Sequence, residues 1–347
     1  MRLASVEVIP YALPFREPYV TARGRLDQRE LVLLRLRDDE GLVGLGEAVP
    51  LSLRGGVGIA DVVEELQRLG ELEALDEATV GAASLSAPAR CAALTALMDL
   101  RGRRVETGRG EPASPPVPCN ATLVAGEPAA VAADAERWAE AGFSVFKLKL
   151  GAGDDVGQVR AVRDALGPSP QIRVDANGAW DVETATRTLA ELEQHNIELV
   201  EQPVETLEQS AVVAASTSIP IAGDESLESR ADAERAKEVG ACRLAGLKIS
   251  KVGGPEAAVE IAEVLPSYVS SALDGPVGIA AAAQVAQTLE AAEGGGPGIA
   301  HGLATQLLFA ATIASVECEL RGDMLHPPPG PGLGVEIDEN ALQAHRL

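Results

Sequence analysis

The sequence has few cysteines and no long apolar run. Its 347 residues include four cysteines with no close spacing, which indicates neither a disulfide framework nor a zinc site and favours a reduced, cytoplasmic setting. The N-terminal segment MRLASVEVIPYALPF lacks the continuous apolar core of a signal peptide and is typical of a strand. No stretch approaches the roughly 18 apolar residues of a transmembrane helix, and the longest candidate, around Leu303–Val316, predicts a buried helix.

Positive charge is also scarce. The chain carries 29 basic and 52 acidic residues, a formal net charge of −23 at pH 7. Because such a surface repels polyanions, we expect neither nucleic acid nor an anionic membrane as a partner. Phosphate-binding loops are missing from the sequence, since no GxGxxG opens a helix after the first strand and neither GxxxxGKS nor GxxxxGKT occurs. No sequence feature assigns an oligomeric state.

What the sequence does contain is a regular series of charged residues. Three carboxylates, Asp175, Glu201 and Asp224, end three successive apolar runs, with Lys149 upstream of them and Lys248 downstream. Successive members of this series lie 26, 26, 23 and 24 residues apart, about the length of one strand–helix unit. Because the carboxyl ends of parallel strands meet at one mouth of a barrel, we expect these side chains to converge there.

Strand-like and helix-like segments alternate between residue 116 and about residue 320. The strand candidates are Val117–Leu123, Ser144–Leu150, Ile172–Asp175, Ile197–Glu201, Ile219–Ala222, Leu244–Lys248 and Tyr268–Ser271. The helix candidates are Ala129–Ala141, Asp154–Leu166, Val182–Gln194, Leu207–Ala215, Arg230–Val239, Pro255–Leu265 and Ile279–Ala292. A short run near Ile299 is a candidate eighth strand. The alternation predicts an α/β fold with a barrel over residues 116–320, rather than an open doubly wound sheet.

The first 115 residues lack this alternation. Their strand candidates, followed by their helix candidates, are Ser5–Ala12, Glu30–Arg37, Leu42–Glu47, Ile59–Gly70 and Pro88–Leu100. This order predicts a separate α+β domain over residues 1–115, joined to the barrel by the Pro/Gly-rich segment 108–119. Residues 321–347 include HPPPGPGLG, which predicts an irregular tail that packs back on the first domain.

The types of charged residue favour a metal site. Side chains alternate across a strand, so Lys147 and Lys149 face the same side, and in a barrel covered by helices they must point inward or cap the strand end. Taken alone, a K-x-K pair is equally typical of a solvated strand, and a single carboxylate is often an ion-pair partner or a helix cap. Three carboxylates at one mouth need a cation, and oxygen donors without His or Cys favour Mg²⁺ or Mn²⁺.

Several motifs together resemble a known family. They are FKLKL (146–150), RVDANGAW (173–180), VEQPV (200–204), AGDES (222–226), GLKISKVGG (246–254) and SSALDGPVG (270–278). With these motifs the whole chain resembles the enolase superfamily, in its muconate-lactonizing subgroup, and within it the o-succinylbenzoate synthases of menaquinone biosynthesis. The resemblance implies a modified (β/α)7β TIM-like barrel, with an N-terminal α+β capping domain that the C-terminal tail completes.

The resemblance also implies a role for each charged residue. Lys149 would be the acid/base on one face of a small-molecule carboxylate substrate, and Lys248 would stand on the opposite face, with Lys147 as electrostatic support. Lys251 is the competing residue on that second face, although it is expected in a Gly-Gly loop beyond the strand. The metal ligands would be Asp175, Glu201 and Asp224, holding Mg²⁺ against a developing enediolate.

The implied reaction is that of a carbon–oxygen lyase. It is the syn dehydration of 2-succinyl-6-hydroxy-2,4-cyclohexadiene-1-carboxylate to 2-succinylbenzoate. An N-succinylamino acid racemase or a dipeptide epimerase is the nearest alternative, since either would use two lysines on opposite faces of one carbon. A non-catalytic metal-binding barrel is a third hypothesis.

Further residues are candidates for substrate binding. Ser270 and Ser271 end the seventh strand candidate and resemble the family's contacts to a succinyl carboxylate, although ordinary strand-end residues look the same. Asn177 would orient the metal shell, with Glu225 as a neighbour. The loops Pro18–Arg29 and Leu51–Gly58 should cover the mouth. They supply three candidate anion contacts, Arg23, Arg25 and Arg54.

Overall fold

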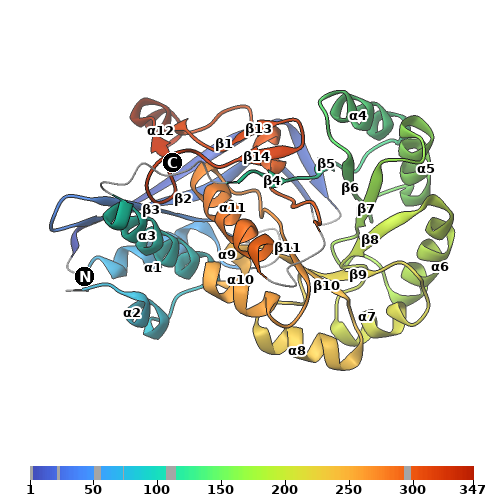
Figure 1. Cartoon of the computed structure of the whole chain (residues 1–347), viewed down its shortest axis with the longest axis horizontal. Coiled ribbons are helices and arrows are strands. Elements are labelled where there is room, and N and C mark those ends of the chain that lie inside the picture. Colours follow the sequence, from blue (N-terminus) through green and yellow to red (C-terminus); the bar gives the residue numbers. More distant parts are fainter. Residues whose placement is uncertain (1–2, 22–23, 51–55, 73, 107–114, 293–297) are drawn as a thin grey trace.

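A computed structural model describes residues 3–21, 24–50, 56–72, 74–106, 115–292 and 298–347. Figure 1 shows an antiparallel sheet with helices beside a curved parallel sheet whose helices lie on its outside. The C-terminal segments return to the side of the antiparallel sheet. We call the antiparallel sheet and its helices the cap, and the parallel sheet and its helices the barrel.

The cap sheet has the order β1 (Leu3–Thr21), β2 (Gly24–Asp38) and β3 (Val43–Ala48), with helices α1 (Ile59–Leu69), α2 (Glu77–Ala82) and α3 (Ala87–Glu106). The central strand β2 is apolar on both faces. Its residues Leu31 and Leu33 join the core shared with the barrel, whereas Val32 and Leu34 join the core beneath α1 and α3. Alternating side chains of one strand therefore bind the cap helices on one face and the barrel side on the other.

Two glycines let β3 lie directly against α3. A Cβ atom on Gly44 or Gly46 would overlap a backbone carbonyl oxygen of α3, that of Ala96 or Ala92 respectively. Helix α3 in turn contacts α9 (Ile249–Val252) of the barrel. The cap therefore reaches the carboxyl end of the strand that precedes α9.

The barrel sheet is parallel and has the order β11-β10-β9-β8-β7-β6-β5. Its strands are β5 (Ala121–Leu123), β6 (Val145–Lys149), β7 (Gln171–Asp175), β8 (Ile197–Glu201), β9 (Ile221–Gly223), β10 (Leu244–Leu247) and β11 (Ser267–Val269). The remaining barrel helices are α4 (Pro128–Glu140), α5 (Asp155–Leu166), α6 (Val182–Leu192), the 3-10 turn η2 (Glu193–His195), α7 (Leu207–Ala214), α8 (Arg230–Val239), α10 (Pro255–Ala262) and α11 (Pro276–Ala291).

The barrel is closed by a very short eighth element. Gly302 forms a parallel bridge to Ser270 beyond β11, and His301 forms one to Cys119 before β5. Backbone hydrogen bonds accompany both bridges, including Gly302 N–H to the Val269 carbonyl at 2.8 Å. The eighth strand expected near Ile299 is thus reduced to a pair of bridges, and the predicted fold class, a (β/α)7β barrel with an N-terminal cap, is confirmed.

The C-terminal segments have more regular structure than we predicted. They contain η3 (Ala304–Leu308), β12 (Ala314–Val316), β13 (Glu319–Arg321), β14 (Met324–His326), β15 (Glu336–Ile337) and α12 (Glu339–His345). The helix expected over Leu303–Val316 is wrong, since only η3 is helical there. The single strand expected over Val117–Leu123 is two strands, because β4 (Val117–Pro118) pairs with β14.

The tail contacts the cap. Arg35 on β2 pairs with Glu339 of α12 at 2.6 Å, and the Leu347 N–H donates to the Pro10 carbonyl at 3.0 Å. Residues 108–114 of the predicted linker (108–119) lie outside the described residues, and the domain boundaries at 115/116 and 320/321 stay predictions. Within the described ranges no helix combines the length and the apolar character needed to cross a bilayer.

The glycines of β3 generate a stability prediction. Gly46→Ala should lower the free energy of unfolding by about 1–3 kcal/mol, because the new methyl group forces β3 and α3 apart. Gly81→Ala, in helix α2 with open space around it, is the matched control and should change stability by less than about 1 kcal/mol in the opposite direction. Urea unfolding measures both. Equal stability of Gly46→Ala and the parent chain would show that the close approach is not a constraint.

Candidate active site

The three carboxylates lie together at the carboxyl ends of neighbouring strands. Asp175 ends β7, Glu201 ends β8, and Asp224 follows β9 directly. In the sheet register Lys149 is opposite Asp175, and Asp175 is opposite Glu201. All three carboxylates are fully buried, so their charges must be compensated inside the protein.

The paired lysines of β6 point inward, as the alternation of the strand predicts. Lys147 Nζ lies 2.9 Å from Asp175 Oδ2 and 2.6 Å from Glu201 Oε2, so one ammonium group serves two carboxylates. Lys149 Nζ lies 2.6 Å from Asp175 Oδ2 and donates to Asn177 Oδ1 at 3.2 Å. On this side of the site, the two lysines and the two carboxylates therefore form one network of ion pairs.

A second pair of lysines lies on the opposite flank. Lys248 directly follows β10 and donates to Asp224 Oδ2. Lys251 is in helix α9 and not in the Gly-Gly loop that we expected. Its ammonium group donates to the backbone carbonyls of Asp224 and Leu227, which fixes the loop after β9. Of the two, Lys248 is thus the better candidate for contact with a substrate.

The buried charges shift each other's pKa. Although burial disfavours its charged form, the Lys147 and Lys149 ammonium groups hold the pKa of Asp175 well below its usual range. Burial and the neighbouring Asp175 charge raise the pKa of Glu201. Burial opposes the ammonium form of both lysines, yet Asp175 raises the pKa of Lys147 and of Lys149 above the ordinary lysine value. Both lysines are charged in this arrangement.

Tyr268 is a site residue that the sequence analysis missed. It lies on β11, and its hydroxyl crosses the barrel interior to donate to Glu201 Oε2. Gly246 on β10 makes room, because a Cβ there would overlap the tyrosine ring. The Arg173 guanidinium lies 5.3 Å from the centre of that ring and pairs with Glu198 at 2.6 Å. The inward face of β11, read from strand alternation, is the signal that could have found Tyr268.

Gln202 connects two of the carboxylate loops. Its backbone is left-handed, with φ 40°, and its side chain is 1% exposed. Gln202 Oε1 accepts from the Asp224 N–H at 2.8 Å and from the Ser226 N–H at 3.2 Å, while Nε2 donates to the Val204 carbonyl at 2.8 Å. The side-chain amide of Gln202 thus joins the loop after β8 to the loop after β9 by hydrogen bonds and positions Asp224.

Only some of the residues predicted to contact substrate lie at the site. Asn177 lies at the site, where its Nδ2 donates to Glu225 at 3.1 Å. The Ser271 hydroxyl is engaged in a turn, since it donates to Asp274 Oδ2 at 2.7 Å, and Ser270 takes part in barrel closure. Arg25 pairs with Asp27 on an exposed hairpin. The other two arginines, Arg23 and Arg54, and the loop residues 51–55 lie outside the described residues.

The oxygen donors fit a hard divalent cation. Asp175, Glu201 and Asp224 offer only carboxylate oxygen, the donor that Mg²⁺ prefers. Buried Glu201 Oε1 has no hydrogen-bond partner among the described residues, which is a donor atom available to an ion. Lysine ammonium groups lie beside one oxygen each of Asp175 and Glu201 and beside both oxygens of Asp224. With the carboxylates paired in this way, no group of three or more His, Cys, Asp or Glu side chains in the described ranges is arranged to hold a metal ion.

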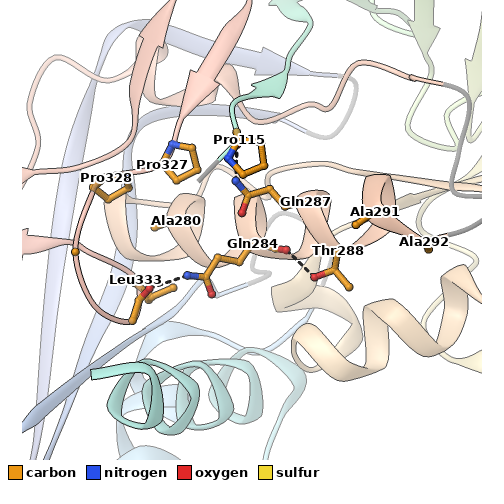
Figure 2. A pocket seen from close by; sticks show the side chains of 12 residues that line it. Pro115, Ala280, Gln284, Gln287, Thr288, Ala291, Ala292, Pro327, Pro328 and Leu333 are labelled. Atoms are coloured by element: carbon orange, nitrogen blue, oxygen red, sulfur yellow. Dashed lines mark hydrogen bonds between the residues drawn. The ribbon is translucent and has the colours of Figure 1, made fainter. Parts of the chain in front are cut away.

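A cavity of about 800 Å³ lies elsewhere, between α11 and residues 327–333. Figure 2 shows two glutamines of α11 at this cavity, with Gln284 bonded to the chain beside Leu333 and Gln287 pointing toward Pro115. Its lining contains no acidic or basic side chain. The cluster of charged side chains described above therefore lies at the mouth of the barrel and not at this cavity.

Comparison with known proteins identifies the family. Residues 130–341 match the family described as enolase C-terminal domain-like, and residues 3–108 match the mandelate racemase / muconate lactonizing enzyme N-terminal domain. The chain belongs to the enolase superfamily. This assignment covers the cap and the barrel, as the resemblance of the motifs predicts.

Relatives within the enolase superfamily have different activities. An o-succinylbenzoate synthase of Thermobifida fusca is 39% identical over 246 residues, 68% of this chain and 73% of the relative. Muconate cycloisomerase 1 of Pseudomonas putida is 31% identical over 363 residues, 96% of each chain. The structure of a dipeptide epimerase from Cytophaga hutchinsonii, complexed with Mg and the dipeptide D-Ala-L-Val, superposes with a TM-score of 0.89 at 26% identity, covering 99% of this chain and 98% of the other.

Gln202 generates the prediction for this site. Gln202→Leu should lower the free energy of unfolding by about 1–3 kcal/mol, because buried N–H groups of Asp224 and Ser226 lose their acceptor. Gln194→Leu is the matched control on the exposed turn η2 and should be nearly neutral. Thermal and urea unfolding compare the two variants. Equal effects would show that Gln202 does not link the two loops.

Proposed function

We propose that the chain is a Mg²⁺-dependent o-succinylbenzoate synthase of menaquinone biosynthesis, a hydro-lyase. One observation carries the proposal: Lys149 and Lys248 approach a buried, all-oxygen carboxylate set from opposite flanks. A relative at 39% identity, an o-succinylbenzoate synthase, supports this reaction.

The metal would be held by Asp175, Glu201 and Asp224. The epimerase neighbour was solved with Mg, and the donor set of this chain has the same hard-oxygen character that Mg²⁺ requires. A bound Mg²⁺ would supply positive charge to the substrate carboxylate while the adjacent carbon loses its proton. Mn²⁺ has similar ligand preferences and would serve the same site.

The lysines would carry the proton. Lys149, in its neutral form, would take the proton from the carbon beside the substrate carboxylate, and the electron pair of that C–H bond would remain with the substrate. The same lysine, now an ammonium, would give its proton to the departing hydroxyl on the same face, so that the C–O bond breaks and water leaves. Lys248 on the other flank would stabilise the anion. Lys147 would hold Asp175 and Glu201 in place through its ion pairs.

The positions of Lys149 and Lys248 on opposite sides of the carboxylates are also compatible with a second function. A racemase or epimerase needs one base on each face of a carbon, and Lys149 and Lys248 meet that need as well. N-succinylamino acids and dipeptides are therefore the substrates of the nearest alternative. A non-catalytic metal-binding barrel is the third hypothesis, and a full set of buried lysines disfavours it.

Substrate turnover distinguishes these functions. We expect the purified, Mg²⁺-loaded protein to convert the cyclohexadiene carboxylate to 2-succinylbenzoate faster than it racemises N-succinylamino acids or epimerises dipeptides, as followed by absorbance and polarimetry. Lys149→Ala should reduce turnover by about 10²–10⁴-fold, because the transferred proton loses its acceptor. Lys237→Ala, an exposed lysine on α8, is the control. Efficient racemisation with negligible dehydration would overturn the proposal, as would full turnover by Lys149→Ala.

Metal binding tests the ligands separately from turnover. Asp224→Asn should weaken Mg²⁺ binding by at least about tenfold, since it removes one charged donor, while circular dichroism should show an unchanged fold. Asp134→Asn, on the surface of α4, is the control. Titration calorimetry with Mg²⁺ alone measures both variants. Parent-like affinity of Asp224→Asn would remove this residue from the ligand set.

A further inference from the structure

The loop after β11 has a strained backbone. Residues 271–275 connect β11 to α11 at the carboxyl end of the barrel strands, where substrate-binding loops of such barrels lie. Leu273 has φ 68° and is buried. A branched side chain rarely takes this left-handed conformation, so contacts around the loop must hold it in place.

Some of the contacts that hold the loop are hydrogen bonds between its own residues. Asp274 Oδ2 accepts from the Ser271 hydroxyl at 2.7 Å and from the Ala272 N–H at 2.6 Å. The Asp274 N–H donates back to the Ser271 hydroxyl at 2.9 Å. These bonds close a turn, but they involve only residues of the loop and do not fix it relative to the rest of the site.

The cap supplies the external contacts. Arg29 on β2 is 5% exposed and donates to the Ala272 carbonyl at 3.1 Å and to the Pro50 carbonyl at 2.7 Å. Glu47 on β3 is 2% exposed, and its Oε1 accepts from the Gly275 N–H at 2.6 Å. Two cap residues therefore hold opposite ends of the loop through hydrogen bonds.

The Glu47 contact is specific in both shape and hydrogen bonding. Its Oε2 accepts from the Tyr11 hydroxyl at 2.8 Å, so both carboxylate oxygens are bonded. A Cβ on Gly275 or Gly278 would overlap the Glu47 side chain, which shows how closely the carboxylate approaches the first turn of α11. The N-terminus of a helix favours such an acceptor. Burial and the neighbouring Asp274 raise the pKa of Glu47 to about 8.

We propose that Arg29 and Glu47 are positioning residues that fix the loop of residues 271–275, and with it the wall of the mouth beside Ser270. The cap would thereby set the surface against which the non-reacting part of the substrate binds. This inference rests on the proposed catalytic site, but it concerns how tightly substrate is held and not which proton moves.

Kinetics of cap variants test the inference. Arg29→Met and Glu47→Leu keep side-chain volume but remove the polar contacts. Each should raise KM about tenfold with kcat changed less than about twofold, since a released loop must be ordered again by the substrate. Glu47→Gln retains an acceptor for the Gly275 N–H and should restore most of the affinity. The double variant of Arg29→Met and Glu47→Leu should show less than the product of the single effects, because both act through one loop.

Hydrogen exchange of the Mg²⁺-loaded protein tests the loop without any reaction. Peptides covering residues 270–278 should exchange faster in Arg29→Met and Glu47→Leu, whereas peptides of β7 should not. Arg35→Met on the same strand as Arg29 is the matched control, since Arg35 pairs with Glu339 of the tail instead.

The two measurements have separable outcomes. Unchanged exchange in folded variants would overturn the inference, whatever reaction the protein catalyses. Faster exchange with unchanged KM would show that the cap holds the loop but does not position substrate, which also overturns it. If the protein does not catalyse the dehydration but turns over another substrate, the KM of the cap variants for that substrate tests the loop contact. Failure of the proposed reaction is thereby distinguished from failure of the loop contact.

Discussion

The ion pairs of Lys147 with Asp175 and Glu201 are the interaction on which the site depends. Two carboxylates on adjacent strands are fully buried, and their mutual repulsion would otherwise force one of them to bind a proton. A single ammonium group between them, at 2.9 and 2.6 Å, offsets both charges at once. The barrel can therefore keep concentrated negative charge in its interior, which is the precondition for holding a divalent cation there.

Compensation by lysine also limits what the site can do without a further cation. Asp175 holds Lys149 in its ammonium form, and an ammonium cannot accept a proton. A cation shared by the carboxylates would weaken that hold, since it competes for the same oxygens. The chemistry and the electrostatics of the site are thus linked through one residue, Asp175, which contacts both lysines of β6.

Sequence patterns predicted the site better than they predicted its supports. The strand ends of β7 and β8 and the inward lysines of β6 follow from local apolar runs and the two-residue period of a strand. Tyr268, Gln202 and Glu47 were missed, because each acts through a side-chain hydrogen bond to a residue distant in sequence, such as Glu201 or Gly275. Strand alternation along β11 predicts that Tyr268 faces inward, but the hydrogen-bond partners of these three residues depend on the closed barrel and the docked cap, which no local pattern encodes.

Failures of local structure had a different cause. Residues 303–316 are apolar because they pack between the barrel and the β1–β2 hairpin, as the stacking of Phe309 on Phe15 at 4.9 Å shows, and not because they form a helix. Apolar composition indicates that a segment is buried, but an α-helix also needs an unbroken series of backbone hydrogen bonds between residues four apart. Here the chain instead forms η3, and β12 then pairs with β15. The proline-rich tail was likewise predicted to be irregular, yet short strands form on either side of its prolines.

The relatives belong to the same superfamily but are named for different reactions, and the proposed site is compatible with that variety. Lysines on opposite flanks of a carboxylate set can remove a proton from either face of a carbon, whether the product is an aromatic ring or an inverted centre. On this proposal the barrel interior would set the type of chemistry, while surfaces that do not touch the reacting carbon would select the substrate. In this chain we propose that those surfaces include the loop of residues 271–275, which contacts Arg29 and Glu47. A change of substrate would then require changes in the cap and this loop, with the carboxylates and lysines left intact.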